Sequence, residues 1–431
     1  MRKLNWISSV IEYPIGVQAR RDNLAIDKTF SKYLANFAEP EVTRLASFPQ
    51  TLVFAQVVIL PAYKESAEFC HRFNIVTESQ QDKLLIVVIN QPDTDMDIEP
   101  QRQLFEKIDH IGDRIWQCEN LSLLQLKSGS FVLVVDRFTQ PIPHKQGVGL
   151  ARKIAADLAC QLISQKQIQS PWVYSTDADA HLPENYFSTL ANISDDTRAL
   201  VFGFYHQAVD SIEHQQEGAA THLYELSMRY YVAGLSYAGS PYNFFTIGSI
   251  LAFCADAYVK VRGFPKRAAG EDFYLLNKIA KLGKIKNEQS VQIKIDARVS
   301  DRVPFGTGPA VEKIINLQQN KQDYCYYQPQ VFVELKQLLD AMNTSAGNLE
   351  ELAIALQDLS AVCSRSLADI GFADFLDKLG AQSISSAQVN RQLRVWFDAF
   401  KTLKFIHALR DNGLPDIPLQ QALNNPHFTT V

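Results

Sequence analysis

Two aspartates, Asp177 and Asp179, stand one residue apart in the segment 175–181 (STDADAH), directly after an apolar run. Close carboxylates repel each other and resist losing water, so a positive partner or open solvent is expected around them. In an extended segment both side chains would share one side, where Mg²⁺ or Mn²⁺ would relieve the repulsion and hold phosphate oxygens. The alternative is a solvated turn in which Asp177 caps the next helix. His181 is a candidate third metal ligand or substrate contact, or else a structural hydrogen bonder.

A second acid pair, Glu271 and Asp272, opens the helical pattern 269–283 (AGEDFYLLNKIAKLG), which Gly283 closes. The positive end of the helix dipole would keep Asp272 ionised near neutral pH, as a base that accepts a proton from a hydroxyl must be. Ordinary placement of acids in a first helical turn is the alternative. Asp272 and Glu271 are the candidate catalytic residues, with Asp272 as the base.

Two further segments suit a nucleotide. In the segment 61–65 (PAYKE), Tyr63 is suited to stacking on a base and Glu65 to hydrogen bonding with it, unless the segment is only a capped helix start. The segment 145–153 (KQGVGLARK) begins a helix with glycines, a place suited to anions.

The later part of the chain adds weaker candidates. Arg298 and Arg302 flank a glycine-rich turn and would clamp phosphates, or lie in a polar loop. The segment 222–244 is rich in aromatic and polar groups, which suit an acceptor sugar or plain packing. Gly248 is expected to let its segment approach the sheet closely.

Four continuous apolar runs predict strands that are buried on both faces: 52–60, 84–89, 131–135 and 172–175. Helical patterns lie between them. Strands that alternate with helices predict an α/β fold, with a mixed, mainly parallel sheet flanked by helices. Ligands of such sheets bind at the carboxyl ends of the strands, so the polar segments that follow these runs are expected to share one edge.

The change of pattern along the chain predicts three parts: an N-terminal extension (1–50), an α/β domain (51–310) and a mostly helical C-terminal region (311–431). An apolar stripe over 389–406 predicts one long amphipathic helix, stopped by Gly413 and Pro415.

The composition narrows the class of protein. A net charge of -5 without a basic tract argues against nucleic-acid binding. The six cysteines show no CxxC spacing, which favours reduced thiols. The N-terminus is a poor signal peptide, and the apolar runs are too short to span a bilayer. We therefore expect a cytoplasmic protein without a transmembrane segment.

Four pieces follow one another in order: PAYKE after the first strand, LLIVVINQPDTD at the second, GVGLARKIAADLA before YSTDADA, and AGEDFYLLNKIAKLG. Together they resemble a family 2 glycosyltransferase with the GT-A fold, a Rossmann-like nucleotide-binding fold. The resemblance covers residues 52–310. The QxxRW motif and membrane helices of processive synthases are absent from it, which implies a single, non-processive transfer.

The resemblance implies a nucleoside-diphosphate sugar donor, a hydroxyl acceptor and Mn²⁺ or Mg²⁺ as cofactor. The second strand departs from the family pattern, because it ends in NQPD rather than in a double Asp with Gly-Ser. Carried over by position, the implied roles are a nucleoside pocket (Pro61, Ala62, Tyr63, Glu65), a base or ribose contact (Asn90 or Asp93), a nucleoside or diphosphate contact (Arg152), direct and metal-mediated nucleotide contacts (Asp177, Asp179) and the base of inverting members (Asp272).

Several alternatives stay open. A retaining GT-A transferase acting on a small acid, such as glycerate or phosphoglycerate, would use His181 at the metal and the Arg298–Arg302 loop. A non-catalytic module would bind the sugar nucleotide or a partner protein. A nucleotidyltransferase is disfavoured because its N-terminal glycine-rich loop is missing. The donor sugar, the nucleobase and the acceptor are not fixed, and residues 1–50 would cover the donor site or join a homodimer.

Overall fold

The computed structural model describes residues 28–77, 82–207, 215–297 and 306–429. Within these residues the chain builds one ten-stranded sheet in the order β3-β4-β5-β2-β1-β6-β9-β8-β10-β7. The strands are β1 Gln56–Ala62, β2 Lys83–Pro92, β3 Gly112–Cys118, β4 Leu121–Leu126, β5 Phe131–Ile142, β6 Trp172–Ser175, β7 Ala180–His181, β8 Thr197–Gln207, β9 Leu251–Cys254 and β10 Lys284–Asp296.

The pairings place most strand ends together. β1 runs parallel to β2 and β6, β2 to β5, and β8 to β10. β9 lies between β6 and β8 and is antiparallel to both, so β6 and β8 run in the same direction. β4 and β7 are the other reversed strands. The carboxyl ends of β1, β2, β5, β6, β8 and β10 therefore meet at one edge of the sheet, as predicted.

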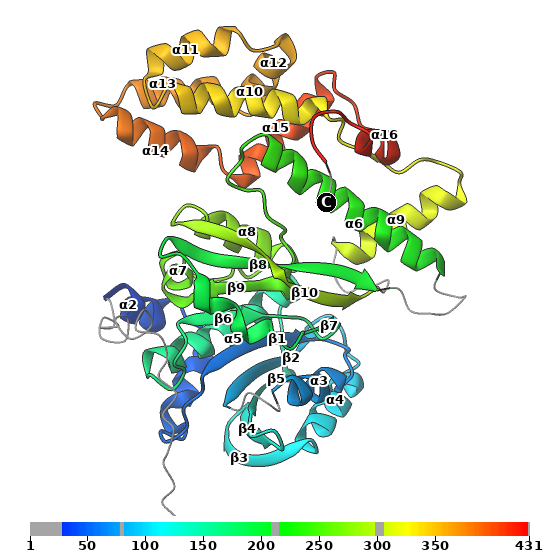
Figure 1. Ribbon diagram of the computed structural model, residues 1–431. Coiled ribbons are helices and arrows are strands. Elements are labelled where there is room, and N and C mark those ends of the chain that lie inside the picture. Colours follow the sequence, from blue (N-terminus) through cyan, green and yellow to red (C-terminus); the bar gives the residue numbers. More distant parts are fainter. Residues whose placement is uncertain (1–27, 78–81, 208–214, 298–305, 430–431) are drawn as a thin grey trace, which may run out of the picture.

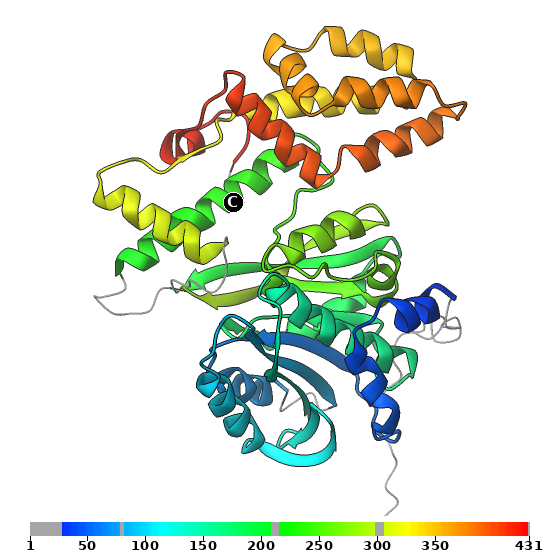
Figure 2. The same cartoon turned by 180° about the vertical axis from the view of Figure 1, so that it is seen from behind.

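Helices cover both faces of this sheet (Figures 1 and 2). They are α3 Glu68–Val76, α4 Glu99–Asp109, α5 Gly147–Ser164, α7 Ala255–Lys260 and α8 Glu271–Ile279, with the short turns η2 Tyr186–Asn192 and η4 Gly248–Ile250. α5 is buried along nearly its whole length and packs on β1 and β2. The predicted α/β class, a mixed and mainly parallel sheet flanked by helices, is confirmed.

The predicted strands are recovered with shifted ends. β6 coincides with the run 172–175, while β1 begins four residues later than predicted. β5 was predicted to end at Val135, before Asp136, but continues to Ile142. The Asp136 carboxylate accepts hydrogen bonds from the backbone of Phe138 and Thr139, which stabilises an irregular step without ending the strand.

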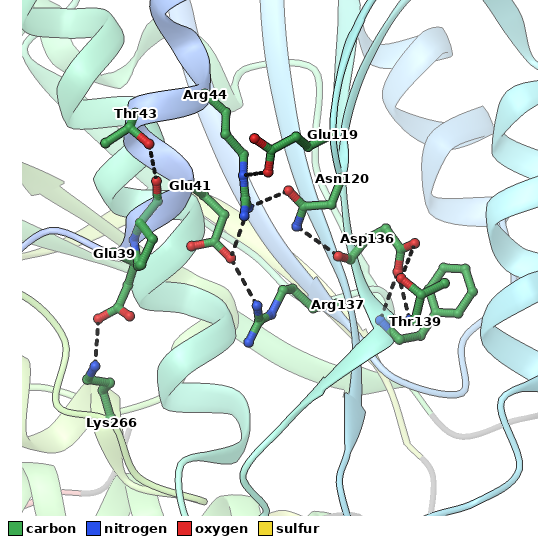
Figure 3. A network of polar contacts seen from close by, with 12 residues as sticks. Glu39, Glu41, Thr43, Arg44, Glu119, Asn120, Asp136, Arg137, Thr139 and Lys266 are labelled. Atoms are coloured by element: carbon green, nitrogen blue, oxygen red, sulfur yellow. Dashed lines mark hydrogen bonds and ion pairs between the residues drawn. The ribbon is translucent and has the colours of Figure 1, made fainter.

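The described part of the N-terminal extension joins the main core. α2 Lys28–Asn36 and the 3-10 helix η1 Pro40–Ser47 pack on α5 and α7. Figure 3 shows how η1 is held: Arg44 and Arg137 both point toward the buried carboxylate of Glu41. Arg44 also reaches Glu119 between β3 and β4. This network fixes η1 to the outer strands.

The C-terminal helices form a second layer above the sheet domain (Figure 1). The long helix α6 Gln215–Tyr237 lies with them. The C-terminal helices themselves are α9 Thr307–Gln319, α10 Gln330–Thr344, α11 Leu349–Gln357, α12 Ala361–Asp369, α13 Phe372–Gly380, α14 Ser386–Trp396, α15 Ala399–Asp411 and α16 Leu419–Leu423. A short pair of strands, β11 Cys325–Tyr326 and β12 Ile417–Pro418, lies among them. Their hydrophobic cluster includes Tyr230 and Leu235 of α6 and Ala238 just after it. α6 thus belongs to the core of this layer as well.

The predicted helix over 389–406 was wrong in one respect. The structure divides it into α14 and α15, with a break at Phe397 and Asp398. Asp398 leaves helical geometry to become the N-cap of α15, accepting hydrogen bonds from the backbone of Phe400 and Lys401. In the described ranges, no helix has the length and apolar character needed to cross a membrane.

Candidate functional site

A buried arginine lies at the centre of the candidate site. Arg152, in the second turn of α5, is 3% exposed. Its guanidinium donates to Asp177 Oδ1 at 2.6 Å and to Glu271 Oε1 at 2.8 Å. Burial lowers the pKa of Arg152, but the charges of Asp177, Glu271 and Asp272 outweigh burial and raise it above its ordinary value. The two acid pairs found in the sequence therefore belong to one site.

The end of β6 and the segment of Gly248 accept further hydrogen bonds from Arg152. Arg152 donates to Ser175 Oγ at 2.8 Å and to the carbonyl of Gly248 at 3.3 Å, and Ser175 Oγ donates to the same carbonyl at 2.9 Å. A Cβ at Gly248 would lie 2.2 Å from a guanidinium nitrogen of Arg152. The predicted close approach of Gly248 is therefore confirmed, and its reason is the space that the guanidinium needs.

The segment with Asp177 and Asp179 is a turn, so the extended conformation assumed for it was wrong. Ala180 N donates to Asp177 O at 3.1 Å, which closes the turn, and Arg72 of α3 donates to the carbonyl of Ala178. Ala178 is buried while both aspartates are half-buried. The positive partner expected for Asp177 is Arg152.

The start of α8 separates the roles of its two acids. The Glu271 side chain is 5% exposed and is paired with Arg152. Asp272 is half-buried, and its carboxylate accepts from the backbone of Phe273 at 2.6 Å. Burial and the charge of Glu271 outweigh Arg152 and raise the pKa of Asp272 to about 8. This raised pKa runs against the prediction that the helix dipole keeps Asp272 ionised near neutral pH.

The glycines at the start of α5 have a packing role. Gly149 N donates to the carbonyl of Arg267 at 3.0 Å, and a Cβ at Gly149 would lie 2.5 Å from the carbonyl oxygen of Pro265. A Cβ at Gly147 would lie 2.8 Å from Ala268. The backbone that leads into Glu271 thus covers this helix start, which was expected to suit an anion.

The predicted nucleoside pocket lies where β1 ends. Pro61 and Ala62 are buried, and Glu65 is half-buried. The hydroxyl of Tyr63 donates to Asp95 Oδ2 at 2.5 Å, and Lys64 Nζ lies 2.8 Å from the same oxygen. These partners, with Lys64 first, lower the pKa of Asp95 to about 2.

The end of β2 supplies the other predicted base contacts. Asn90 is 6% exposed, beside Arg137 of β5. Asp93 Oδ1 accepts from the backbone of His144 at 2.8 Å, which ties the end of β2 to the connection between β5 and α5. Asn90 and Asp93 thus lie at the predicted edge, and their nucleotide roles stay predictions.

His181 lies beside the end of β10, where Asp296 N donates to Asp179 O at 3.1 Å. β7 pairs with β10, and His181 Nε2 lies 2.9 Å from Asp296 Oδ1. Among the described residues, no three His, Cys, Asp or Glu side chains converge as a metal site. Mg²⁺ is commonly held by one or two carboxylates together with substrate phosphates, so the half-buried Asp179 fits such a cation as a protein ligand. His181 meets Asp296 through Nε2, an arrangement that is compatible with metal ligation by Nδ1.

α6 lies over the carboxyl end of β8. Glu225 accepts from the backbone and ring of His206 at 2.8 Å and pairs with Arg229, which bonds to the carbonyl of Phe204. Burial, with the charges of Tyr324 and Asp272, raises the pKa of Tyr224 to about 12. Part of the aromatic segment therefore lies within electrostatic reach of Asp272.

Arg298 and Arg302 fall outside the described residues.

Three contacts in and around the candidate site were not predicted from the sequence. Ser175 was counted only as the end of a strand, although its hydroxyl joins Arg152 to Gly248. Asp296 ends a strongly charged strand that the apolar pattern could not reveal. The contact of Asn277 with Asp398 joins residues that are 121 positions apart, so no local sequence pattern predicts it.

No family model matches the chain, and no curated protein matches it. Solved structures with a likeness include S. aureus TarS 1–349, 12% identical over 79% of this chain and 92% of that chain, with a TM-score of 0.35. The same TarS fragment in complex with UDP-GlcNAc is 12% identical over 79% and 93%, with a TM-score of 0.36. A mycobacterial protein is 11% identical over 69% and 82%, with a TM-score of 0.32. These values assign the chain to no family.

Proposed function

We propose that the protein is a metal-dependent glycosyltransferase that moves a single sugar from a nucleoside-diphosphate donor to an acceptor hydroxyl. The observation that carries the proposal is the buried guanidinium of Arg152, which binds Asp177 and Glu271 at once. It brings a turn with two aspartates and a helix start with two acids together at the carboxyl edge of an α/β sheet, where ligands of such sheets bind.

Different residues are proposed to hold the acids, the cation and the nucleoside. Arg152 holds Asp177 and Glu271 in fixed positions, and Asp179 offers a carboxylate to Mg²⁺ or Mn²⁺. Such a cation, when bound with the donor, stabilises the negative charge that develops on the leaving diphosphate. Tyr63, Glu65, Asn90 and Asp93 are the residues proposed to bind the nucleoside.

Asp272 is the proposed base of an inverting reaction. It takes the proton from the acceptor hydroxyl that attacks the sugar from the face opposite the diphosphate. Because its pKa is raised to about 8 in the protein without ligands, the ionised form grows as the pH rises toward that value. We expect kcat/KM to increase from pH 6 to 8, since this parameter reports the free enzyme's essential groups.

The retaining alternative would use His181 at the metal, and the bond between His181 Nε2 and Asp296 is compatible with that role. NMR analysis of the product's anomeric configuration separates the two: an inverted product supports Asp272 as the base, and a retained one contradicts it.

A thermal-shift panel tests the donor site. UDP, GDP, CDP and dTDP are each added with Mn²⁺, with Mg²⁺ and with EDTA, to the wild type, Asp179→Ala and the control Asp374→Ala. Asp374 is exposed on α13, among the C-terminal helices. Ligand at about 100 times its dissociation constant adds roughly 2.7 kcal/mol of stability, a shift of several degrees for a domain of this size.

We expect one nucleotide to shift the melting temperature of the wild type and the control, only with metal, and to leave Asp179→Ala unshifted. A shift that persists in EDTA would contradict the metal role of Asp179. If no nucleotide shifts the wild type, the donor site itself is contradicted, and the non-catalytic reading takes its place.

A further inference from the structure

The C-terminal helices reach into the sheet domain at the helix that carries Asp272. Asn277 of α8 is 6% exposed and uses both ends of its amide on one short segment. Its Nδ2 donates to Asp398 Oδ2 at 3.0 Å, and its Oδ1 accepts from the backbone of Ala399 at 2.9 Å. A buried amide with both groups satisfied specifies one arrangement of its two partners. α8 and the start of α15 are therefore fixed relative to each other.

Asp398 joins three separate contacts. Its Oδ1 caps α15, while Lys281, just beyond α8, donates to its Oδ2 at 2.6 Å. Burial acts to raise the pKa of Asp398, but the bonds from Lys281 and Asn277 outweigh it, so the pKa lies below its ordinary value. Ala399 belongs to the hydrophobic cluster of the sheet domain rather than to that of the C-terminal helices. The break between α14 and α15 is what brings these two residues to α8.

α8 is thus held at both ends. At its start, Glu271 is bound by Arg152, and about one and a half turns after Asp272, Asn277 is bound by residues 398–399. A short helix moves as a rigid body, so a change at Asn277 is carried to Asp272 as a rotation or shift. A displacement of about 1 Å in a reacting group can lower a rate by roughly a hundredfold.

We propose that Asp398 and Asn277 are positioning residues, which hold α8 so that Asp272 meets the acceptor hydroxyl. The proposal rests on the proposed function. It gives the C-terminal helices a part in the transfer step, through the orientation of one helix, while the donor site is formed by other elements.

The test compares two helix caps. Asp398→Ala removes the cap of α15 and the bond to α8. Asn348→Ala, the matched control, removes the cap of α11, where Asn348 accepts from the backbone of Glu350 and Glu351 and has no contact with α8. Either change lowers stability through the lost cap. Asp398→Asn keeps a capping residue, and Asn277→Ala breaks the junction from the other side if Asp398→Ala does not fold.

The first measurement is hydrogen exchange of the backbone amides of residues 271–279, without any ligand. We expect faster exchange in Asp398→Ala and Asn277→Ala than in the wild type, unchanged exchange in Asn348→Ala, and an intermediate rate in Asp398→Asn. Equal exchange in all variants would overturn the proposal.

The second measurement separates positioning from simple destabilisation. Sugar conjugates of the nucleotide that binds in the thermal-shift panel are hydrolysed with water as the acceptor of the sugar, and the nucleoside diphosphate that is released is measured. We expect kcat of Asp398→Ala to fall about tenfold or more, with KM for the donor within about twofold, and Asn348→Ala to keep both. A rise in KM with unchanged kcat, or equal losses in the control, would contradict the proposal. If the wild type releases no diphosphate, the transfer function fails, while the exchange comparison still decides whether the junction holds α8.

Discussion

At the scale of single residues, the site depends on one cation placed among three acids. The two carboxylates after β6 call for a positive partner, and Arg152 supplies it to Asp177 at 2.6 Å. The same guanidinium neutralises Glu271 and leaves Asp272 as the acid with a raised pKa. Environments that push the pKa values of neighbouring acids apart are typical of sites where one acid handles a proton.

Gly248→Ala tests how closely the guanidinium is packed. The added methyl group would lie within 2.5 Å of two guanidinium atoms, so either Arg152 or the segment of Gly248 must move. We expect a loss of about 1–3 kcal/mol of stability in urea denaturation, with weaker nucleotide binding. Gly380→Ala is the control, because the nearest atom to its new Cβ is 3.6 Å away. Equal stability of the two variants would show that Arg152 has more room than the structure gives it.

Asp272→Asn has a pH-dependent effect on stability. In the wild type the folded-state pKa of Asp272, about 8, lies above the ordinary value of 3.8. The folded protein therefore holds a proton that the unfolded chain has lost, and its stability falls as the pH rises between these two values. Asparagine does not titrate and so removes this pH dependence, and the variant should gain stability relative to the wild type from pH 5 to 8. Urea denaturation at several pH values measures the difference; a constant difference would contradict the raised pKa.

At the scale of elements, α5 carries a second buried network behind the arginine. Asp157 is fully buried and accepts from Lys153 Nζ at 2.8 Å, from Tyr33 of α2 at 2.6 Å and from Tyr258 of α7 at 3.0 Å. The network joins three helices immediately next to Arg152, so the N-terminal helix α2 helps to fix the helix on which the site is built.

Lys153→Met should be strongly destabilising. It leaves the Asp157 carboxylate buried without its cation, a change that costs about 3–5 kcal/mol. Lys336→Met is the control, since Lys336 pairs with Asp340 on the exposed side of α10 and such pairs contribute roughly 0–1 kcal/mol. Chemical denaturation of both variants measures the difference. Similar losses would mean that the hydroxyls of Tyr33 and Tyr258 satisfy Asp157 without the lysine.

The elements that the sequence predicted well are those whose pattern is local. The apolar runs of β1, β2, β5 and β6 are buried on both faces, so their composition is decisive. β10 was missed because charged and polar residues occupy much of it. The candidate residues were found by type and order, whereas the pairing of Arg152 with Glu271 joins residues 119 positions apart and is a product of the fold.

At the scale of the whole molecule, the two layers share helices and core. Tyr230 and Leu235 of α6 lie in the hydrophobic cluster of the C-terminal helices, as does Ala238 just after it. A Cβ at Gly234 of α6 would lie 2.6 Å from the ring of Phe332 in α10. α6 is thus covered by α10 along one face, and the chain does not divide cleanly near residue 310.

A chain shortened to end at residue 328 should therefore not behave as a folded monomer. It would expose the apolar face of α6 and lose Ala399 from the main cluster. We expect aggregation or an early melting transition in size-exclusion chromatography and thermal denaturation. A monomer that melts like the full chain would show that the sheet domain is independent of the C-terminal helices.

The bond between Asn277 and residues 398–399 also has a consequence for the order of synthesis. A ribosome makes the chain from its N-terminus, so every strand of the large sheet exists before α15 does. The contacts of Asn277 with residues 398–399 can form only after the start of α15 has been translated. A nascent copy that stalls before α15 would therefore lack the contacts that hold the end of α8, although every strand of the sheet is already complete.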